Sequence, residues 1–215
     1  MIQSRFPDPR RARGDVVALG DDLSPETIID AYRHGIFPWP TEGIILPWFS
    51  PKRRAVLDYD RLHLSRSLKR AARTTRFEFT IDAAFDRVIG ECAAGPRPGQ
   101  DGTWIFPEVA AAYSELHRLG HAHSVEAWEG GELVGGIYGV DAGGAFGGES
   151  MFHRRPDASK LALLHLMEHL HARGLDWLDI QVMTPHMEAM GARMISRSAF
   201  LRRLEEAQES GLVLF

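Results

Sequence analysis

The sequence has 215 residues and is poor in several residue types that define protein classes. Its single cysteine, Cys92, excludes an internal disulfide and a cysteine-rich zinc site, and fits a reducing compartment. No apolar run approaches the roughly 18 residues that a membrane helix needs, and the charged first twenty residues contain no signal-like segment. We therefore predict a soluble, cytoplasmic protein with no membrane partner.

Lysine is also scarce: three lysines stand beside 22 arginines, and the formal net charge is −4. Arginine binds phosphate through a planar fork of donors, but a GC-rich genome would produce the same bias. Both explanations stay open on composition alone. With 44% hydrophobic and 25% charged residues, the composition is that of an ordinary globular protein of one large or two small domains.

The first third of the chain is rich in proline and aromatic residues. One helix is expected there, with Ser24 as N-cap, Pro25 at its first position and Gly35 at its end. The strings at 37–40 and 46–51 combine prolines with large aromatics, and proline at this density argues against regular strand ladders. These aromatics form either a satellite core or a wall beside a ligand groove.

From residue 61 the pattern becomes regular, apart from a Gly- and Pro-rich loop at 95–99. Glycine-containing turns at 130–131 and 141–144 predict antiparallel hairpins. The fold class is α+β: a small N-terminal domain at 1–60 and a C-terminal domain at 61–215 with a mixed sheet flanked by helices. We expect helices at 62–72, 83–93, 107–120, 158–172 and 199–210, and strands at 76–81, 124–128, 133–140, 145–149 and 177–182.

Charge is unevenly distributed along the chain. Residues 51–76 contain nine basic and two acidic side chains, so this segment carries +7 and the rest carries −11. Several of the basic residues recur at helical spacing, where like charges repel, and such a stripe favours a polyanionic partner. A solvated helix face is the alternative. The candidates for phosphate binding are Arg66, Lys69, Arg70, Arg73 and Arg76.

Three polar residues on predicted strands are candidates for catalysis. Asp179 and Gln181 alternate with apolar neighbours and so project from one face, roughly 7 Å apart. Together they could accept protons from an amine and orient it; a structural hydrogen-bonded pair is the alternative. Glu149 follows two glycines at a strand end, which predicts a carboxylate exposed at the rim of a site.

Two other motifs have weaker support. His165 and His169 match the H-x-x-E-H pattern of metalloproteases, but both lie away from the apolar stripe of their helix, so we interpret them as solvent-side histidines and predict no metal site. A mixed sheet with a crossover helix is also typical of acetyl-CoA-dependent N-acetyltransferases. Here the turn at 153–158 lacks the glycines that wrap a pyrophosphate, so we expect no CoA site.

Taken in order, the motifs together resemble one family over nearly the whole chain, that of bacterial leucyl/phenylalanyl-tRNA–protein transferases. Each string is moderately specific, and their ordered combination is highly specific. The strings are Gly35-Ile-Phe-Pro-Trp39, Trp48-Phe-Ser-Pro51, Gly102-Thr-Trp-Ile105, His121-Ala-His-Ser-Val-Glu126, Leu133-Val-Gly-Gly-Ile-Tyr-Gly-Val140, Gly148-Glu-Ser-Met-Phe152, Ala158-Ser-Lys160 and Asp179-Ile-Gln181.

The resemblance implies an acetyltransferase-like C-terminal domain that moves Leu or Phe, with Met a further candidate, from aminoacyl-tRNA to an N-terminal Arg or Lys. That transfer marks the acceptor protein for degradation. Asp179 and Gln181 would act on the attacking α-amine, and Glu149 would orient the acceptor. Trp104 would hold the 3′-terminal adenosine. The implied amino-acid pocket contains Phe146, Ile137 and Leu178, with Trp48 in its aromatic wall.

Aminolysis of an activated ester needs alignment and proton removal, so no cofactor is expected. We expect a monomer. The alternatives are an acyl-CoA N-acetyltransferase and a non-enzymatic RNA-binding module built on residues 51–76.

Overall fold

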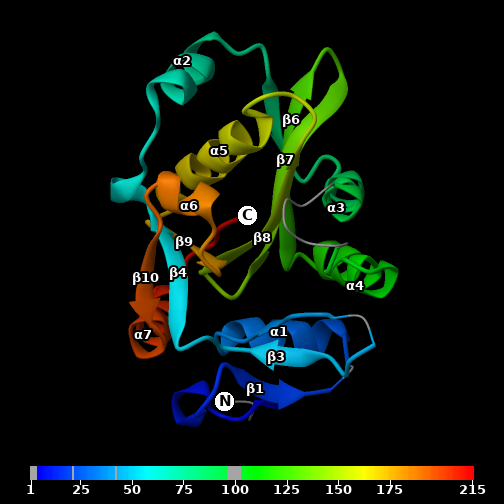
Figure 1. The fold of residues 1–215 in the computed structure, drawn as a ribbon, viewed down its shortest axis with the longest axis vertical. Coiled ribbons are helices and arrows are strands. Elements are labelled where there is room, and N and C mark those ends of the chain that lie inside the picture. Colours follow the sequence, from blue (N-terminus) through cyan, green and yellow to red (C-terminus); the bar gives the residue numbers. More distant parts are fainter. Residues whose placement is uncertain (1–3, 21, 42, 96–102) are drawn as a thin grey trace.

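The computed structural model describes residues 4–20, 22–41, 43–95 and 103–215. The predicted loop at 95–99, beyond Gly95, and Gly102 of the fourth string lie outside these residues. Within the described part of the chain the strands form a three-stranded and a seven-stranded sheet (Figure 1). The larger sheet has the order β10-β4-β9-β8-β7-β6-β5, and its neighbours are antiparallel except for the parallel pair β8 and β9.

The predicted meander and its helices are confirmed with small shifts at their ends. The three meander strands are β6 (Ala122–Glu129), β7 (Glu132–Asp141) and β8 (Phe146–His153). The other two predicted strands are β5 (Glu78–Ile81) and β9 (Trp177–Gln181). The helices are α1 (Pro25–Arg33), α3 (Phe85–Ala94), α4 (Pro107–Arg118), α5 (Ala158–Ala172) and α7 (Arg197–Glu209). The α+β class predicted from the sequence is therefore confirmed.

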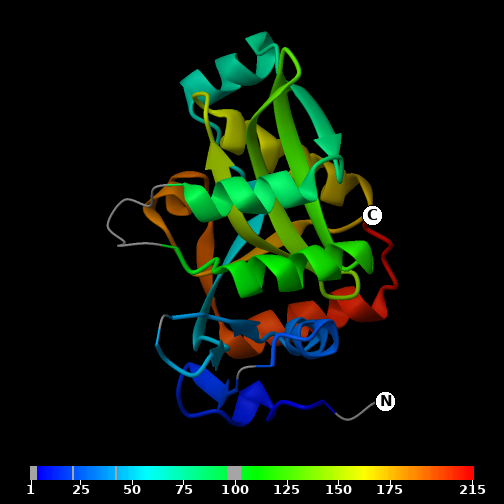
Figure 2. The same cartoon turned by 90° about the vertical axis from the view of Figure 1, so that its right-hand side faces the viewer.

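Helices cover both faces of the large sheet. Helix α5 packs on β6 and β7 from one side, and α3 and α4 pack from the other, where Figure 2 shows them in front of the strands. Leu163, Leu166, Met167 and Leu170 of α5 are all buried, as their spacing predicts. Helix α7 packs on β4 and β10. The core therefore runs along both faces of one sheet.

Two strands of the large sheet were not expected, β4 (Arg53–Asp58) and β10 (Arg193–Ser196). β4 lies between β10 and β9, so it brings residues that precede position 60 into the large sheet. A boundary near residue 60 stays a prediction. The short helix α6 (Pro185–Ala189) follows β9, and one-turn 3₁₀ helices occupy Pro9–Arg11 and Tyr59–Arg61.

Two local expectations were wrong. The small sheet pairs β1 (Val16–Leu19), β3 (Pro47–Phe49) and β2 (Phe37–Pro38) in antiparallel fashion, with one irregularity between Val16 and Ala18. Its strands can pair because the prolines sit at the ends of very short strands. The helix expected at 62–72 is α2 (Arg66–Thr74); it begins after Ser65, whose hydroxyl caps the amide of Leu68 at 3.2 Å.

Gly35 ends α1 for a steric reason. It has φ +72°, and a Cβ there would lie 2.5 Å from a methyl carbon of Leu201. The turn therefore needs glycine both for its backbone angle and for the close approach of α7. Among the helices of the described residues, none is long and apolar enough to cross a membrane.

Candidate active site

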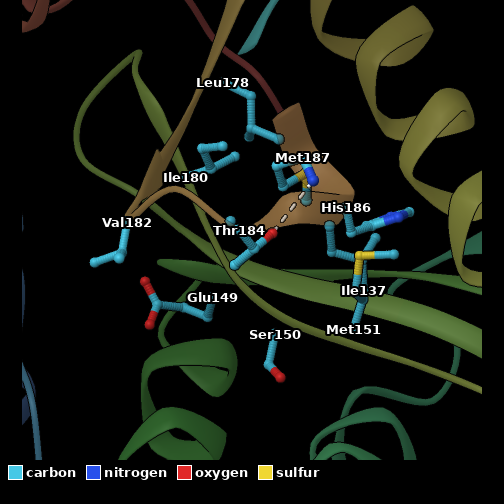
Figure 3. A pocket seen from close by; sticks show the side chains of 11 residues that line it. Ile137, Glu149, Ser150, Met151, Leu178, Ile180, Val182, Thr184, His186 and Met187 are labelled. Atoms are coloured by element: carbon cyan, nitrogen blue, oxygen red, sulfur yellow. Dashed lines mark hydrogen bonds between the residues drawn. The ribbon is translucent and has the colours of Figure 1, made fainter. Parts of the chain in front are cut away.

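The site lies where two parallel strands separate. β8 and β9 pair at Gly147 and Asp179, and beyond that point a cavity of about 210 Å³ lies between them. Figure 3 shows the side chains of β7, β8, β9 and the α6 region converging on it. The cavity is lined by Ile137, Gly148, Glu149, Ser150, Met151, Leu178, Ile180, Val182, Thr184, His186 and Met187.

The walls of this cavity are mainly apolar. Leu178, Ile180 and Val182 all line it, which confirms the alternation predicted for β9. Ile137 of β7 and Met151 of β8 close the opposite side. A small apolar cavity with a carboxyl group at its edge can hold an aliphatic or aromatic side chain and present a polar group to Glu149.

A second cavity, of about 140 Å³, is aromatic in character. It is lined by Phe37, Pro38, Trp39 and Trp104, and it shares Glu149, Ile180, Val182 and Thr184 with the first. The two cavities therefore meet at a common wall. The aromatic string at 37–39, left open as satellite core or groove wall, here does line a groove.

Glu149 is not exposed at a rim, as the sequence suggested; it is half-buried. The side-chain amide of Gln181 donates to its Oε1 at 2.9 Å, and the hydroxyls of Tyr32 and Tyr113, themselves 2.7 Å apart, also hydrogen-bond it. Burial of the carboxyl group raises the pKa of Glu149 to about 7, because desolvation outweighs these hydrogen bonds; the charge of Asp179 raises it further.

Asp179 is held by a buried arginine. Arg54 Nε and Nη2 donate to its two carboxylate oxygens at 2.8 and 2.7 Å, and the backbone amide of Gln181 donates to Oδ1 at 3.0 Å. Arg54 is 1% exposed and Asp179 6%. The sequence placed Arg54 in the basic segment at 51–76, whereas the structure pairs it inside the protein.

Gln181 connects the two carboxyl groups. Its backbone amide binds Asp179 and its side chain binds Glu149, and its φ of +54° turns the chain at the end of β9. A non-glycine residue in this region is strained, and such strain is often found at functional sites. Asp179, Gln181 and Glu149, which the sequence singled out, therefore lie in one hydrogen-bonded network.

Of the residues predicted for substrate binding, some line the two cavities and others are buried elsewhere. Ile137, Leu178 and Trp104 line the two cavities. Phe146 is buried beside the ring of Phe215, at 5.2 Å between centroids, and lines neither cavity. Trp48 is also buried, with its indole N–H donated to the carbonyl oxygen of Gly20.

The predicted phosphate-binding residues lie on and after α2, at the end of the molecule opposite the small sheet (Figure 1). All five are exposed. Arg76 follows the helix rather than extending its stripe, because α2 ends at Thr74. The five are Arg66, Lys69, Arg70, Arg73 and Arg76.

The two histidines of the H-x-x-E-H pattern are not simply solvent-side, because both are half-buried. His169 Nε2 lies 2.8 Å from the carbonyl oxygen of Leu214, and His165 stacks on Phe79 with ring centroids 5.2 Å apart. Within the described residues, no group of three or more His, Cys, Asp or Glu side chains is placed to hold a metal ion.

Sequence reasoning missed three residues of this site: Arg54, Tyr32 and Tyr113. Tyr32 and Tyr113 lie on predicted helix faces and are spaced like core residues, so their hydroxyls gave no sign of a partner. Arg54 is 125 positions from Asp179, and only the β4–β9 pairing brings them together.

Comparison with known proteins places the chain. Residues 56–205 match the family described as Leucyl/phenylalanyl-tRNA protein transferase, and residues 21–52 match the N-terminal domain of that family. The chain belongs to this family.

Named relatives agree with that assignment. The Leucyl/phenylalanyl-tRNA--protein transferase of Anaeromyxobacter sp. (strain Fw109-5) is 53% identical over 94% of this chain and 86% of its own length. Those of Nitratidesulfovibrio vulgaris (strain DP4) and Chromobacterium violaceum are 52% and 51% identical, over 94% and 89% of this chain and 87% and 82% of their own lengths.

Solved structures with similarity to the chain are more distant. They include a ribosomal-protein-alanine N-acetyltransferase from Brucella melitensis biovar Abortus 2308, with a TM-score of 0.35 and 15% identity over 53% of this chain and 84% of that one. A functionally unknown conserved protein from Staphylococcus epidermidis ATCC 12228 has a TM-score of 0.44 and 11% identity over 67% of this chain and 57% of that one.

Proposed function

We propose that this chain transfers Leu or Phe, with Met as a further candidate donor residue, from aminoacyl-tRNA to the N-terminal Arg or Lys of an acceptor protein. The observation that carries the proposal is the position of Glu149. A carboxyl group with a pKa of about 7 lies in the wall between an apolar cavity and an aromatic cavity. Two substrates can therefore meet at one group that exchanges a proton near neutral pH.

The chemistry needs little more than this. Glu149, ionised, takes a proton from the acceptor's α-ammonium group, whose pKa of about 8 lies close to its own. The free amine attacks the carbonyl carbon of the aminoacyl ester and forms the amide bond. The ester bond to the terminal ribose breaks, and the departing ribose oxygen takes the second proton that the nitrogen loses as the amide forms. The first proton then leaves Glu149 for solvent.

The donor fits the two cavities. The Leu or Phe side chain enters the apolar cavity against Ile137, Leu178 and Ile180, which leaves the ester beside Glu149. Trp104 and Trp39 supply aromatic faces in the second cavity on which the 3′-terminal adenine can stack. We expect β-branched Ile and Val to be poorer donors than Leu and Phe.

Asp179 serves as an anchor rather than as the base in this proposal. Its two oxygens already accept three hydrogen bonds, from Arg54 and from the amide of Gln181. It holds Gln181, and Gln181 orients the carboxyl group of Glu149. The negative charge of Glu149 also attracts the basic acceptor terminus.

The body of the tRNA is expected to contact α2. Arg66, Arg70 and Arg73 are exposed on that helix and can neutralise phosphates without reading bases. The new N-terminal Leu or Phe would mark the acceptor for degradation. We expect the chain to act as a monomer, without metal or CoA, in the cytoplasm.

The test incubates purified protein with labelled Leu-tRNA and a peptide that begins with Arg, with labelled acetyl-CoA as the parallel donor. We expect label to reach the peptide from Leu-tRNA alone. Transfer only from acetyl-CoA would identify an N-acetyltransferase, and retention of tRNA without transfer would identify an RNA-binding module. A peptide that begins with Ala is the matched control and should stay unlabelled.

A further inference from the structure

Arg54 is among the most deeply buried charged residues of the described chain, and the proposed reaction does not touch it. The guanidinium of Arg54 lies between the rings of Phe37 and Phe200, with its central carbon 4.4 Å from each centroid. Its Nη1 donates to the carbonyl oxygen of Gly35 at 3.3 Å, and its Nε and Nη2 donate to the carboxylate of Asp179. Arg54 is thus fixed by β2, β9, α7 and the turn that follows α1.

Burying a charged group in this way costs free energy of folding. A buried ion pair often stabilises a protein no better than apolar side chains of the same volume, because both ions lose their hydration. Elsewhere on the same strand, Asp58 pairs with Arg193 and Arg203, which are 44% and 25% exposed. β4 therefore carries one partly hydrated ion pair and one that is fully enclosed, and the enclosed pair is the one beside the cavities.

A continuous series of hydrogen bonds connects Arg54 with Glu149. Arg54 fixes Asp179, Asp179 accepts the backbone amide of Gln181, and the side chain of Gln181 donates to Glu149. Gln181 needs this support because its backbone has a positive φ. Without the fork of Arg54, only the hydrogen bond from the backbone amide of Gln181 would remain in this network to orient the carboxylate of Asp179.

We propose that Arg54 is a positioning residue for the transfer reaction: by holding both carboxylate oxygens of Asp179, it sets the position of Gln181 and thereby the orientation of the Glu149 carboxyl group. The inference rests on the proposed function, in which Glu149 is the base. It predicts that the pair acts on turnover through its geometry and not only on stability.

The charges of this network also act on Glu149. The groups that face Glu149 are Tyr32 on α1, Tyr113 on α4, Asp179 and Gln181 on β9, and Arg54 on β4. Asp179 raises the pKa of Glu149 and Arg54 lowers it, so the two ions oppose one another. Asp179→Asn should therefore lower the pKa of Glu149, because it leaves the cation without its counter-ion.

The experiment uses the full chain and four variants: Arg54→Met, Arg54→Lys, Asp179→Asn and the double variant Arg54→Met/Asp179→Asn. Arg54→Met leaves a buried carboxylate without its partner, so we expect its melting temperature to fall. The double variant removes both charges and should recover the melting temperature. We nevertheless expect its kcat to stay at least tenfold below that of the unaltered chain, with Arg54→Lys in between. A double variant with full stability and full kcat would overturn the proposal.

A second readout does not need activity. The pKa of Glu149 can be followed by ¹³C NMR of its carboxyl carbon, assigned with Glu149→Gln, in the free protein. Asp179→Asn should move the midpoint to lower pH, and Arg193→Met, which alters the other ion pair of β4, should leave it unchanged. An unmoved midpoint in Asp179→Asn would refute the coupling. If the unaltered chain transfers nothing from Leu-tRNA, the proposed function fails, whatever the NMR midpoint does.

Discussion

Arginines of one stretch of sequence have opposite environments in the fold. Arg54 on β4 is enclosed by two aromatic rings and paired with Asp179. Arg66, Arg70 and Arg73, which follow within twenty residues, are exposed on α2. The interior charge is bound to fixed partners within the protein, whereas the exterior charges are free to attract a mobile polyanion.

The difference shows what a charge count can and cannot reveal. The +7 of residues 51–76 includes Arg54, whose charge is neutralised by Asp179 and never reaches the surface. The surface field of this segment is therefore weaker than the sequence indicates, and it is concentrated on α2. The two groups of arginines should also respond differently to salt, because buried pairs are screened much less than exposed charges.

The largest effect should come from the interior network. Glu149→Gln keeps the shape and the contact with Gln181 but removes proton uptake, so we expect kcat to fall by about 10²- to 10³-fold. In the unaltered chain kcat/KM should rise with pH to a midpoint near 7, where Glu149 ionises. Glu206→Gln, an exposed carboxyl on α7, is the matched control and should behave like the unaltered chain. A Glu149→Gln variant with near-normal kcat would exclude Glu149 as the base.

The pH dependence of the free energy of unfolding should also reflect the raised pKa of Glu149. Its pKa is about 7 in the folded chain against an ordinary 4.5, so the folded state holds a proton that the unfolded state has released. The stabilisation is fully present below pH 4.5 and is lost as pH rises through 7, and the full loss amounts to about 3 kcal/mol. Urea unfolding at pH 5 and pH 8 should show this loss, and Glu149→Gln should lack it. Parallel pH profiles for the two proteins would contradict the perturbed pKa.

Asp179 tests whether interior and exterior charges act separately. Asp179→Ala removes the anchor of Gln181, so we expect turnover to fall at least tenfold while tRNA binding persists, because α2 is untouched. Binding is measured by filter retention of labelled tRNA beside the transfer assay. Since the change strands Arg54 in the interior, the melting temperature should fall as well, and Asp179→Asn provides the isosteric control. Loss of tRNA binding in a folded Asp179→Ala variant would show that the interior network and the exposed arginines of α2 do not act separately.

Much of this fold could be predicted from local signals. Pro25 and Pro107 mark the first residues of α1 and α4, and the paired glycines at 130–131 make the β6–β7 turn with positive φ angles. The strand at 177–182 was predicted from its alternation, and its apolar face does line a cavity. These features depend on residues that are close in sequence.

What could not be predicted depends on distant pairing. β4 begins with Arg53 and Arg54, which belong to the basic segment at 51–76. Because these residues were assigned to a charged surface, the buried apolar residues 55–57 that follow were not recognised as a strand. Glu149 was expected at a rim, but Tyr32 and Tyr113, from helices far apart in sequence, enclose it. Enclosure changes the proton affinity of a carboxyl group, and no local pattern records which helices will supply it.

The smallest expected effect concerns the exterior charges. Replacing Arg66, Arg70 and Arg73 together by Ala should weaken tRNA binding by about tenfold at low salt and leave the kcat for bound tRNA unchanged. Each phosphate contact that is lost removes about 0.7–0.9 from the slope of log affinity against log salt, so the slope should fall by about two. Binding is measured by titration at several salt concentrations.

Replacing Arg11, Arg118 and Arg202 by Ala removes the same charge from other surfaces and should change the slope by less than one. The two triple variants have equal net charge, so a difference between them must come from where the charge lies. If both lower the slope equally, tRNA responds to total charge and α2 has no special part in binding. If the α2 variant alone lowers it while Arg54→Lys does not, the exposed arginines bind the polyanion and the enclosed one acts only within the site.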